Sequence, residues 1–254
     1  MQSIGELLTL AKSAASLAGS RLLSFTQEQR RYEHSREHAK EIKALADSIL
    51  EQDILRALAP IGLPILSEES GFIAGQHESP LRFIVDPLDG TFNFVKNLGP
   101  SAVCIALWHL DTPIFGVVYS VSERELIWGG PDLGAHVGDR SISVSSTQRA
   151  AQASLCTGFP VRFDLDDDSM RRFKALVTPY AKVRMLGSAA VSLLQVARGR
   201  ADAYSELNIM LWDVAAGLAI VQGAGGKCSF KSTGIEWCYD VFASNPHLAP
   251  PQES

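Results

Sequence analysis

Two aspartates that lie three residues apart are the first candidates for chemistry in this chain. They occur in the segment 84–94, IVDPLDGTFNF, after an apolar run that is typical of a strand. Pro87 holds Asp86 out of the helical conformation, so the following turn can direct the carboxylates of Asp86 and Asp89 toward one point. Such carboxylates repel each other unless a cation lies between them, and hard oxygen ligands suit magnesium. A capped, Asp-rich turn has the same local pattern, so the surrounding residues must decide between the two interpretations.

The residues that follow these aspartates favour a phosphate group. Gly90 lets the backbone approach a ligand closely, and Thr91 is placed to open a short helix. Backbone N–H groups at the start of a helix favour a bound phosphate. The segment therefore predicts a phosphate beside a metal ion.

Two further acidic residues could complete a metal site. Glu68 belongs to the sequence SEES at 67–70, which follows the short apolar run 64–66. Asp213 stands at the start of a very apolar helical segment. Taken singly, a pair of glutamates is typical of a solvated loop, and an acid at a helix N-terminus is typical of a cap.

Together, these segments resemble the inositol monophosphatase family. Residues 86–94 match its first signature, DPxDGTxNF, and residues 212–217 match its second, WDxAAG. Glu68 matches the glutamate of the family's EE pair. Three other segments are similar to the second half of the family: LGSAA (186–190), GRADAY (199–204) and GAGG (223–226). The resemblance covers nearly the whole chain from about residue 37.

The resemblance implies hydrolysis of a phosphate monoester with two or three Mg²⁺ ions, or with Mn²⁺ in their place. The metal ligands that it implies are Glu68, Asp86, Asp89, Asp213 and the backbone carbonyl of Leu88. Asp86 would bridge two ions, and Glu68 would also orient the attacking water. A bound metal lowers the pKa of water, so this chemistry needs no Ser–His or Cys–His pair.

Further roles follow from the same resemblance. Thr91 matches the threonine that hydrogen-bonds the attacking water, and Asp47 matches the aspartate that orients this threonine. Ala44 stands where many relatives carry a second threonine. Many relatives also use an upstream lysine to help bind a third metal, and Arg36 or Lys40 could take that place. The substrate contacts implied are Gly90, Thr91, Gly187, Ser188 and Ala189.

Glu206 bears on the choice of substrate. It matches the position where inositol phosphatases contact the hydroxyls of the substrate. A carboxylate there can accept hydrogen bonds from a polyol and repels a second phosphate nearby. This favours inositol monophosphate or a related polyol or sugar phosphate. The alternatives are a 3′(2′),5′-bisphosphate nucleotide, fructose 1,6-bisphosphate, histidinol phosphate and NADP, or a non-catalytic regulator that binds a phosphorylated ligand.

The elements that must position these residues can be predicted from apolar spacing. Helices are expected over 4–25 and from about 37 to 58, followed by strands at 64–66, 82–85, 102–108, 114–119 and 125–128. The last third alternates strands at 153–157, 183–186, 201–204, 226–230 and 241–244 with three helices, of which one is capped by Asp168 or Ser169, one is capped by Ser188 and one covers 212–222.

This order predicts an α/β protein, with an α+β half at 1–145 that carries most metal ligands and an α/β half at 146–254. The two halves are expected to form one catalytic unit. The family resemblance implies a layered αβαβα sandwich.

The composition excludes several classes of protein. With 46% hydrophobic and 20% charged residues, the chain is an ordinary globular sequence. Its net charge of −5, without a basic patch, argues against binding of a nucleic-acid polymer. The longest apolar run, 102–108, is too short for a bilayer, so we expect a cytoplasmic protein without a membrane partner. The four cysteines form no CxxC pair, and Cys104 and Cys156 are interpreted as core residues. The resemblance implies a homodimer that acts on a small phosphorylated substrate.

Overall fold

The computed structural model describes residues 2–26, 30, 32–34 and 42–250. The helices are α1 (Ile4–Leu23), α2 (Leu45–Leu58), α3 (Thr91–Lys96), α4 (Asp167–Val177), α5 (Ala189–Ala197) and α6 (Leu211–Gly223). The first ten strands are β1 (Tyr32–His34), β2 (Ile42–Ala44), β3 (Ile65–Ser67), β4 (Gly71–Ile73), β5 (Leu81–Asp89), β6 (Ala102–His109), β7 (Thr112–Ser120), β8 (Glu125–Gly130), β9 (Gly134–Val137) and β10 (Arg140–Ser141). The remaining strands are β11 (Ser154–Cys156), β12 (Lys182–Arg184), β13 (Ala203–Met210), β14 (Lys227–Ser232) and β15 (Cys238–Ser244).

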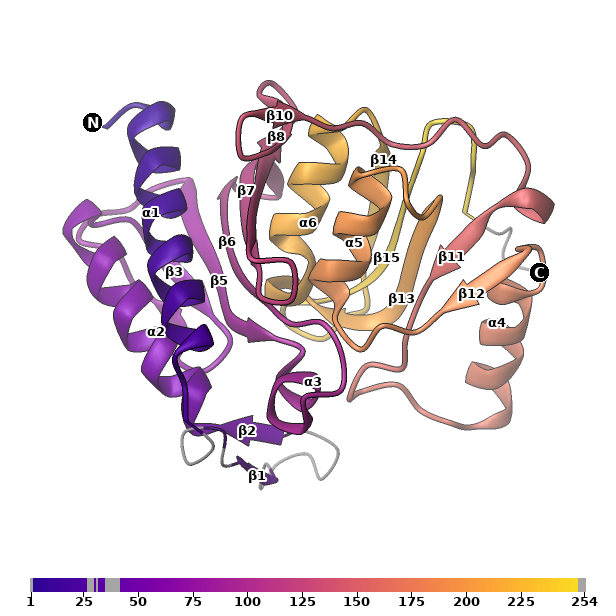
Figure 1. The fold of residues 1–254 in the computed structure, drawn as a ribbon, viewed down its shortest axis with the longest axis horizontal. Helices are drawn as coiled ribbons and strands as arrows, with labels where there is room; N and C mark the ends of the chain where they lie inside the picture. Colours follow the sequence, from indigo (N-terminus) through magenta and orange to yellow (C-terminus); the bar gives the residue numbers. More distant parts are fainter. Residues whose placement is uncertain (1, 27–29, 31, 35–41, 251–254) are drawn as a thin grey trace.

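Helices and sheets alternate in layers along the long axis of the molecule (Figure 1). Helices α1 and α2 cover an eight-stranded sheet of order β10-β9-β8-β7-β6-β5-β3-β4, which is antiparallel except for the pair β3 and β5. Helices α5 and α6 separate this sheet from a five-stranded sheet of order β12-β11-β13-β15-β14, and α4 covers the far face of that second sheet. The predicted α/β class and the αβαβα layering are confirmed.

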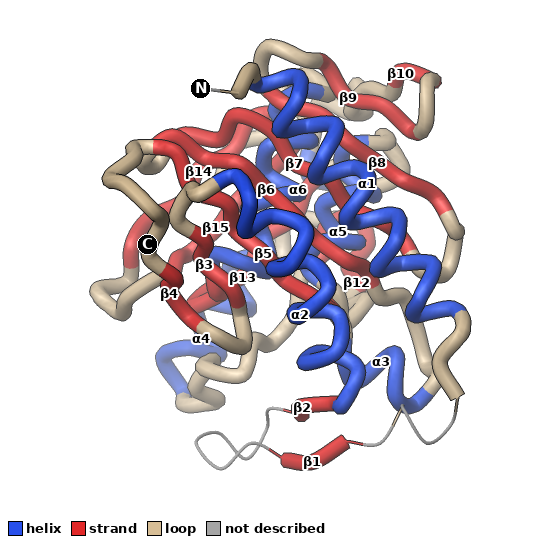
Figure 2. Tube along the Cα trace, turned by 90° about the vertical axis from the view of Figure 1, so that its left-hand side faces the viewer, coloured by secondary structure: helices blue, strands red, loops and turns tan. Residues whose placement is uncertain are grey.

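Helices α1 and α2 lie across the outer face of the first sheet (Figure 2). Helix α1 begins at a capping box, in which Ser3 Oγ accepts from the Glu6 backbone N–H (3.3 Å) and Glu6 accepts from the Ser3 N–H (2.8 Å). Its buried face is the predicted apolar stripe, Leu7, Leu8, Ala11, Ala14, Ala15, Ala18 and Leu22. Because α1 packs on α2 and both pack on the sheet, α2 is held at a fixed distance from β5.

Helix α6 is buried on nearly all sides because it lies between the two sheets. A Cβ atom at Gly116 of β7 would lie only 2.0 Å from the carbonyl oxygen of Ala216 in α6. The helix can approach the first sheet so closely only because glycine has no side chain. This contact fixes the depth of α6 and therefore the position of Asp213 in its first turn.

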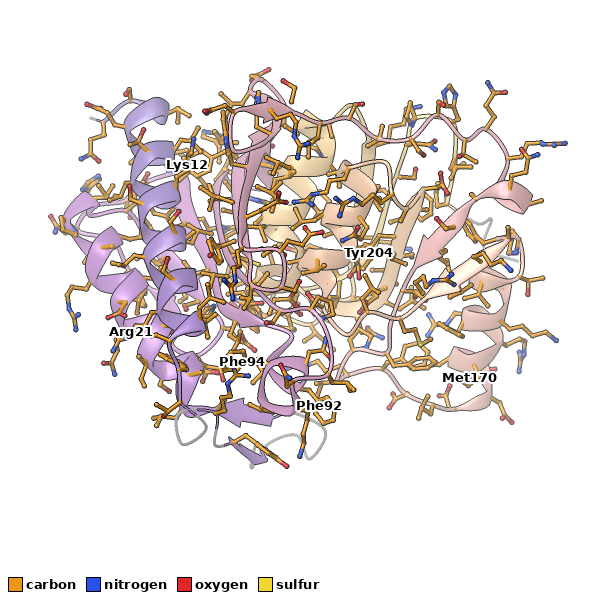
Figure 3. The ribbon with its side chains drawn as sticks, in the orientation of Figure 1. Lys12, Arg21, Phe92, Phe94, Met170 and Tyr204 are labelled. Atoms are coloured by element: carbon orange, nitrogen blue, oxygen red, sulfur yellow. The ribbon has the colours of Figure 1, made fainter. Side chains whose placement is uncertain are left out.

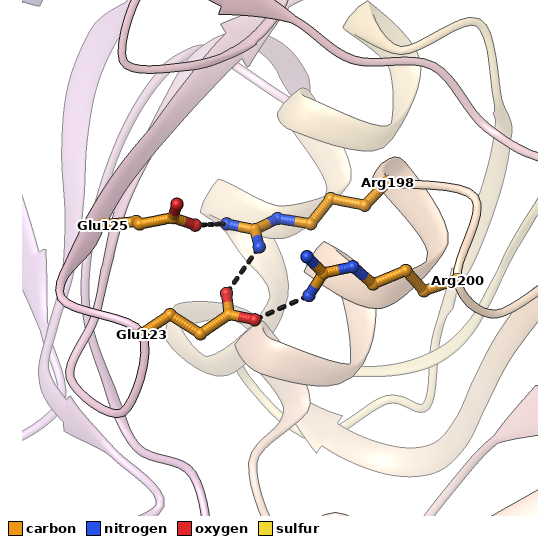
Figure 4. A network of polar contacts seen from close by, with 4 residues as sticks. All are labelled: Glu123, Glu125, Arg198 and Arg200. Carbon is orange, nitrogen blue, oxygen red and sulfur yellow. Dashed lines mark hydrogen bonds and ion pairs between the residues drawn. The ribbon is translucent and has the colours of Figure 1, made fainter.

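A network of ion pairs joins the segment between β7 and β8 to the C-terminal end of α5 (Figure 4). Arg198 donates to Glu123 (2.5 Å) and to Glu125 (2.8 Å), and Arg200 donates to Glu123 (2.6 Å). The side chain of Arg198 is only 4% exposed, so solvent screens its two pairs weakly. The network holds the α5 and α6 layer against the first sheet.

The predicted helix from about residue 37 begins later, at Leu45, and this prediction is corrected. Residues 42–44 form β2 instead and pair antiparallel with β1. Ile42 fits the helical spacing of the apolar residues that follow it, so the sequence pattern did not distinguish a strand from a helix at residues 42–44. The start of α2 is fixed by Asp47, whose carboxylate accepts the N–H of Ala44 at 2.7 Å.

Helix α4 is capped by Asp166 rather than by Asp168 or Ser169 as predicted. The Asp166 carboxylate accepts the N–H of Ser169 at 2.7 Å, which is the usual contact of a cap with the third helical residue. The other predicted helices and strands are present. The sequence pattern missed the strands β1, β4, β9 and β10, which have two to four residues and are too short for a period to be visible.

None of the described helices has the length and apolar character needed to cross a bilayer. All four cysteines are free thiols, and Cys104 and Cys156 are buried, as their apolar surroundings indicated.

The variant Gly116→Ala is expected to lower the free energy of unfolding by about 1–3 kcal/mol, because the added methyl would overlap the backbone of α6. Urea denaturation followed by circular dichroism measures this change. The matched control is Gly5→Ala in the exposed first turn of α1, where the nearest atom is 4.0 Å away and alanine favours the helix. Equal stability of Gly116→Ala and the unaltered protein would contradict the close packing of α6.

Candidate active site

Three carboxylates from two distant parts of the chain meet at the end of β5. Asp86 and Asp89 come from β5, Asp213 comes from the first turn of α6, and their oxygens lie within 4.8 Å of one another. Residues i and i+3 of a regular strand point to opposite faces. The pairing of β5 with β6 shifts register between Asp86 and Asp89, and this irregularity brings both side chains to the same side.

Asp86 is completely buried and only half satisfied. Its Oδ1 accepts the N–H of Leu88 at 2.9 Å, whereas no donor among the described residues reaches its Oδ2. Burial, with the nearby charges of Glu68, Asp89 and Asp213, raises the pKa of Asp86 well above its usual range. A buried oxygen without a donor is costly, so this position favours a cation or a proton beside it.

Asp89 lies at the N-terminus of α5. Its carboxylate accepts the N–H groups of Ala189 (3.2 Å) and Ala190 (3.0 Å), and it also accepts from the hydroxyl of Ser188. Burial raises the pKa of Asp89 to about 6, although these donors act in the opposite direction. Ser188 and Ala189, predicted as substrate contacts, are thus placed on the carboxylate of Asp89.

Glu68 directly follows β3, which runs parallel to β5. Its N–H donates to Val85 O at 3.2 Å, and its carboxyl lies beside that of Asp86. Burial and the nearby charge of Asp213 raise its pKa well above the usual range. The structure therefore brings together all four acidic residues predicted as metal ligands, with Glu68 next to the tight group of three.

Thr91 and Asp47 are in direct contact, as the sequence predicted. The Thr91 hydroxyl lies 3.2 Å from Asp47 Oδ1 and 2.9 Å from the carbonyl oxygen of Leu88. Asp47 is 2% exposed, and burial raises its pKa to about 7, although the hydrogen bond from Ala44 lowers it. One hydroxyl proton can serve only one of the two acceptors at a time, so Thr91 can donate either to Asp47 or to the Leu88 carbonyl.

Gly90 opens α3 with a backbone that favours glycine. Its φ is +80°, and a Cβ there would lie 2.8 Å from Pro100 O and 3.2 Å from Gly187 O. The amide of Asn93 joins the same loops, because its Nδ2 lies 2.8 Å from Pro100 O and 3.1 Å from Gly187 O. This brings the start of α3 to the loop that precedes α5, which places Gly187 at the site.

Helix α3 presents two aromatic rings in different directions (Figure 3). Phe94 is buried in the core between the first sheet and helices α1 and α2, whereas Phe92 is 48% exposed. The buried ring holds the short helix against the fold, so the turn that begins at Gly90 is anchored.

Glu206 approaches the same carboxylates from β13. It is buried, and burial together with the charges of Asp213 and Asp89 raises its pKa to about 8. Its Oε1 would lie 2.7 Å from a Cβ built on Gly158, so the 157–159 loop runs directly beside it. Glu206 therefore lies close to the three converging aspartates, but it contributes none of the three converging oxygens.

The arrangement fits a hard divalent cation. The converging groups are carboxylate oxygens, and Asp86 Oδ2 has no hydrogen-bond donor among the described residues. Oxygen donors of this kind suit Mg²⁺. Burial raises the pKa values of Asp86, Asp89 and Glu68, and the charges of neighbouring carboxylates raise those of Asp86 and Glu68 further.

Two polar residues near the site had no predicted role. Asn93 belongs to the first signature, but the sequence does not indicate which loops its amide joins. Glu51 lies four residues after Asp47, so helical spacing places it on the same face of α2, and this spacing was a usable signal. Arg36 and Lys40, the candidates for the third metal, lie outside the described residues.

Comparison with known proteins gives consistent matches. A sequence profile of the inositol monophosphatase family matches residues 4–249. An inositol-1-monophosphatase of Synechocystis sp. is 43% identical over 166 residues, which is 65% of this chain and only 58% of that protein. A fructose-1,6-bisphosphatase/inositol-1-monophosphatase of Aquifex aeolicus is 32% identical over 98% of this chain and 94% of its own. The crystal structure of extragenic suppressor protein suhB from Bartonella henselae has a TM-score of 0.85 at 31% identity, over 95% of both chains.

Thermal stability without metal is expected to fall as the pH rises from about 4 to about 8. The folded chain keeps protons on Asp89, Asp47 and Glu206, with pKa values of about 6, 7 and 8, which the unfolded chain releases near pH 4. Unfolding is therefore favoured progressively across this window. Differential scanning fluorimetry in EDTA at several pH values measures the effect, and added Mg²⁺ should reduce it. A midpoint that stays constant between pH 5 and pH 8 in EDTA would contradict these shifts.

Proposed function

The chain belongs to the inositol monophosphatase family, and we propose that it hydrolyses a small phosphate monoester with the help of magnesium. Inositol monophosphate or a related polyol or sugar phosphate is the substrate that we favour. The observation that carries the proposal is the convergence of Asp86, Asp89 and Asp213, together with a buried oxygen of Asp86 that has no hydrogen-bond donor among the described residues.

The residues that would hold the magnesium are the predicted ligands Glu68, Asp86, Asp89 and Asp213 and the Leu88 carbonyl. When bound, Mg²⁺ offsets the charge of the phosphate and lowers the pKa of the attacking water. The N-terminus of α5 keeps the Asp89 carboxylate in one orientation, and the N–H of Leu88 does the same for Asp86. Such contacts preserve the geometry of ligands while the substrate binds and leaves.

Thr91 positions the attacking water in this proposal. When Asp47 accepts the hydroxyl proton of Thr91, a lone pair of the Thr91 oxygen becomes available to accept a hydrogen of the water. Glu68, on the neighbouring strand end, can accept the second hydrogen. The N–H groups of Gly90 and Thr91, at the start of α3, would bind phosphate oxygens.

Glu206 supports a polyol as the leaving group. It is a buried carboxyl next to the acidic group, and its oxygens can accept hydrogen bonds from substrate hydroxyls. A second phosphate at this position would be repelled by the charges of Asp213 and Asp89, and by Glu206 when it is ionised. The name of the Aquifex aeolicus relative keeps fructose 1,6-bisphosphate as the alternative that must be tested directly.

Phosphate release from a substrate panel tests the proposal. We expect Mg²⁺-dependent release from inositol 1-phosphate that exceeds release from fructose 1,6-bisphosphate, 3′-phosphoadenosine 5′-phosphate and histidinol phosphate, with no release in EDTA. Preference for a bisphosphate would keep the metal site and overturn the role of Glu206. Absence of release from every substrate would overturn the catalytic assignment.

The variant Asp213→Asn tests the metal assignment within the same assay. Loss of one carboxylate should lower kcat at least about 100-fold, because the charge stabilisation supplied by a metal is worth several kcal/mol. Asp132→Asn changes an exposed acid outside the site and serves as the matched control. Equal rates for the two variants would remove Asp213 from the site.

The variant Glu206→Gln tests the contact with the leaving group. We expect kcat/KM for inositol 1-phosphate to fall about 10-fold, because the glutamine amide keeps only one of the two oxygens that can accept from the substrate. The rate with p-nitrophenyl phosphate, whose leaving group has no further hydroxyls, should change much less. An equal loss with both substrates would show that Glu206 acts on the reacting phosphate instead.

A further inference from the structure

Helix α2 carries two buried acids on one face, and only one of them has been assigned a role. Asp47 and Glu51 are four residues apart and are 2% and 6% exposed. Asp47 contacts Thr91, as described above. Glu51 lies one helical turn further from the start of α2, away from the converging carboxylates of β5 and α6.

The Glu51 carboxylate holds both ends of the segment 67–70. Its Oε1 accepts from the Ser67 hydroxyl at 2.5 Å and from the Ser70 N–H at 3.0 Å, and its Oε2 accepts from the Ser70 hydroxyl at 2.7 Å. Glu68 and its neighbour Glu69 lie between these two serines. The segment is therefore held on both sides of Glu68 by one side chain.

Strand pairing also restrains this segment, with β5 on one side of β3 and with β4 on the other, where Ser67 pairs with Gly71. Ser67 pairs with Val85 in the parallel ladder, and the Glu68 N–H donates to Val85 O at 3.2 Å. The ladder with β5 ends there, and the hairpin with β4 resumes only at Gly71, so within the turn 68–70 the contacts of Ser70 with Glu51 add a restraint of their own. Together, the two restraints direct the Glu68 carboxyl toward Asp86.

A buried carboxylate is a costly way to stabilise a helix. Among the described residues, no lysine or arginine forms an ion pair with Glu51. Burial of a charged group is unfavourable unless hydrogen bonds compensate for it, and an apolar residue of similar volume is often as stable. The contacts of Glu51 thus have a better explanation in what they position than in the stability of α2.

We infer that Glu51 is a positioning residue that holds the Glu68 carboxylate in place for metal binding. This inference rests on the proposed function. Helix α2 then supports the site at two points, with Asp47 on Thr91 and Glu51 on the segment that carries Glu68. Glu51 itself touches neither the substrate nor the converging oxygens.

Two variants separate positioning by hydrogen bonds from a role of the charge. Glu51→Gln can keep the contacts, because its oxygen can accept from Ser67 and Ser70 while its amide donates to the Ser70 hydroxyl. Glu51→Met has a similar volume and no comparable acceptor. Gln52→Met, at the adjacent exposed position of α2, is the matched control.

The affinity of each full-length variant for Mg²⁺, measured by isothermal titration calorimetry without substrate, is the main test. We expect Glu51→Met to bind Mg²⁺ about 10–100-fold more weakly, as is typical when a contact that orients a ligand is removed. Its kcat should recover in part at high Mg²⁺ concentration. Glu51→Gln should remain close to the unaltered protein, and so should Gln52→Met.

Hydrogen exchange of the peptide that spans residues 67–70 provides a second measurement that needs no metal. Exchange should be faster in Glu51→Met and unchanged in Gln52→Met. Faster exchange with unaltered Mg²⁺ affinity would overturn the inference, because the contacts would then be structural only. Equal losses of affinity in Glu51→Gln and Glu51→Met would also overturn it, in favour of a role of the charge. Absence of Mg²⁺ binding by the unaltered protein would overturn the proposed function itself and the inference with it, before any variant is compared.

Discussion

Mutual repulsion among buried carboxylates is the constraint on which the rest of this structure depends. Asp86, Asp89 and Asp213 place their oxygens within 4.8 Å of one another, with Glu68 and Glu206 close by, in a chain that is acidic overall. In a poorly solvated site such charges interact strongly, and burial raises their pKa values. A fold that brings these carboxylates together must therefore offset their repulsion with hydrogen-bond donors, with bound protons or with cations.

Helix N-termini supply much of this compensation. Helices α2, α3, α5 and α6 all begin at the site, and each brings a polar residue at its start. Asp47 and Asp213 lie in the first turns of α2 and α6, and Asp89 accepts N–H groups at the start of α5. The partial positive charge of a helix N-terminus stabilises a nearby carboxylate. The layered sandwich can thus hold a dense acidic group because four helices point their positive ends at it.

The parts of the site that lie close together in the chain were predictable. Asp86, Asp89, Gly90 and Thr91 follow one strand, and the local effects of proline and glycine already indicated a turn that gathers carboxylates. The contact between Asp47 and Thr91 was predicted from the family resemblance and is present. By contrast, the predicted start of α2 was wrong, because the apolar residue Ile42 fits a helix as well as a strand. The start is decided by the hydrogen bond from the Ala44 N–H to the Asp47 carboxylate.

The sequence by itself determined the types of acidic residue, their order along the chain and the α/β class, because apolar spacing and turn residues act within a few positions. The layered sandwich was implied by the family resemblance. Only the tertiary structure decided which polar groups far apart in the sequence form hydrogen bonds with one another. The contact of Glu51 with Ser67 and Ser70 and that of Asp89 with the start of α5 join residues 16 to 101 positions apart. Such pairings depend on how α2, α5 and α6 pack against the sheets. Packing of this kind is the result of all the buried surfaces together, so no local pattern reports it.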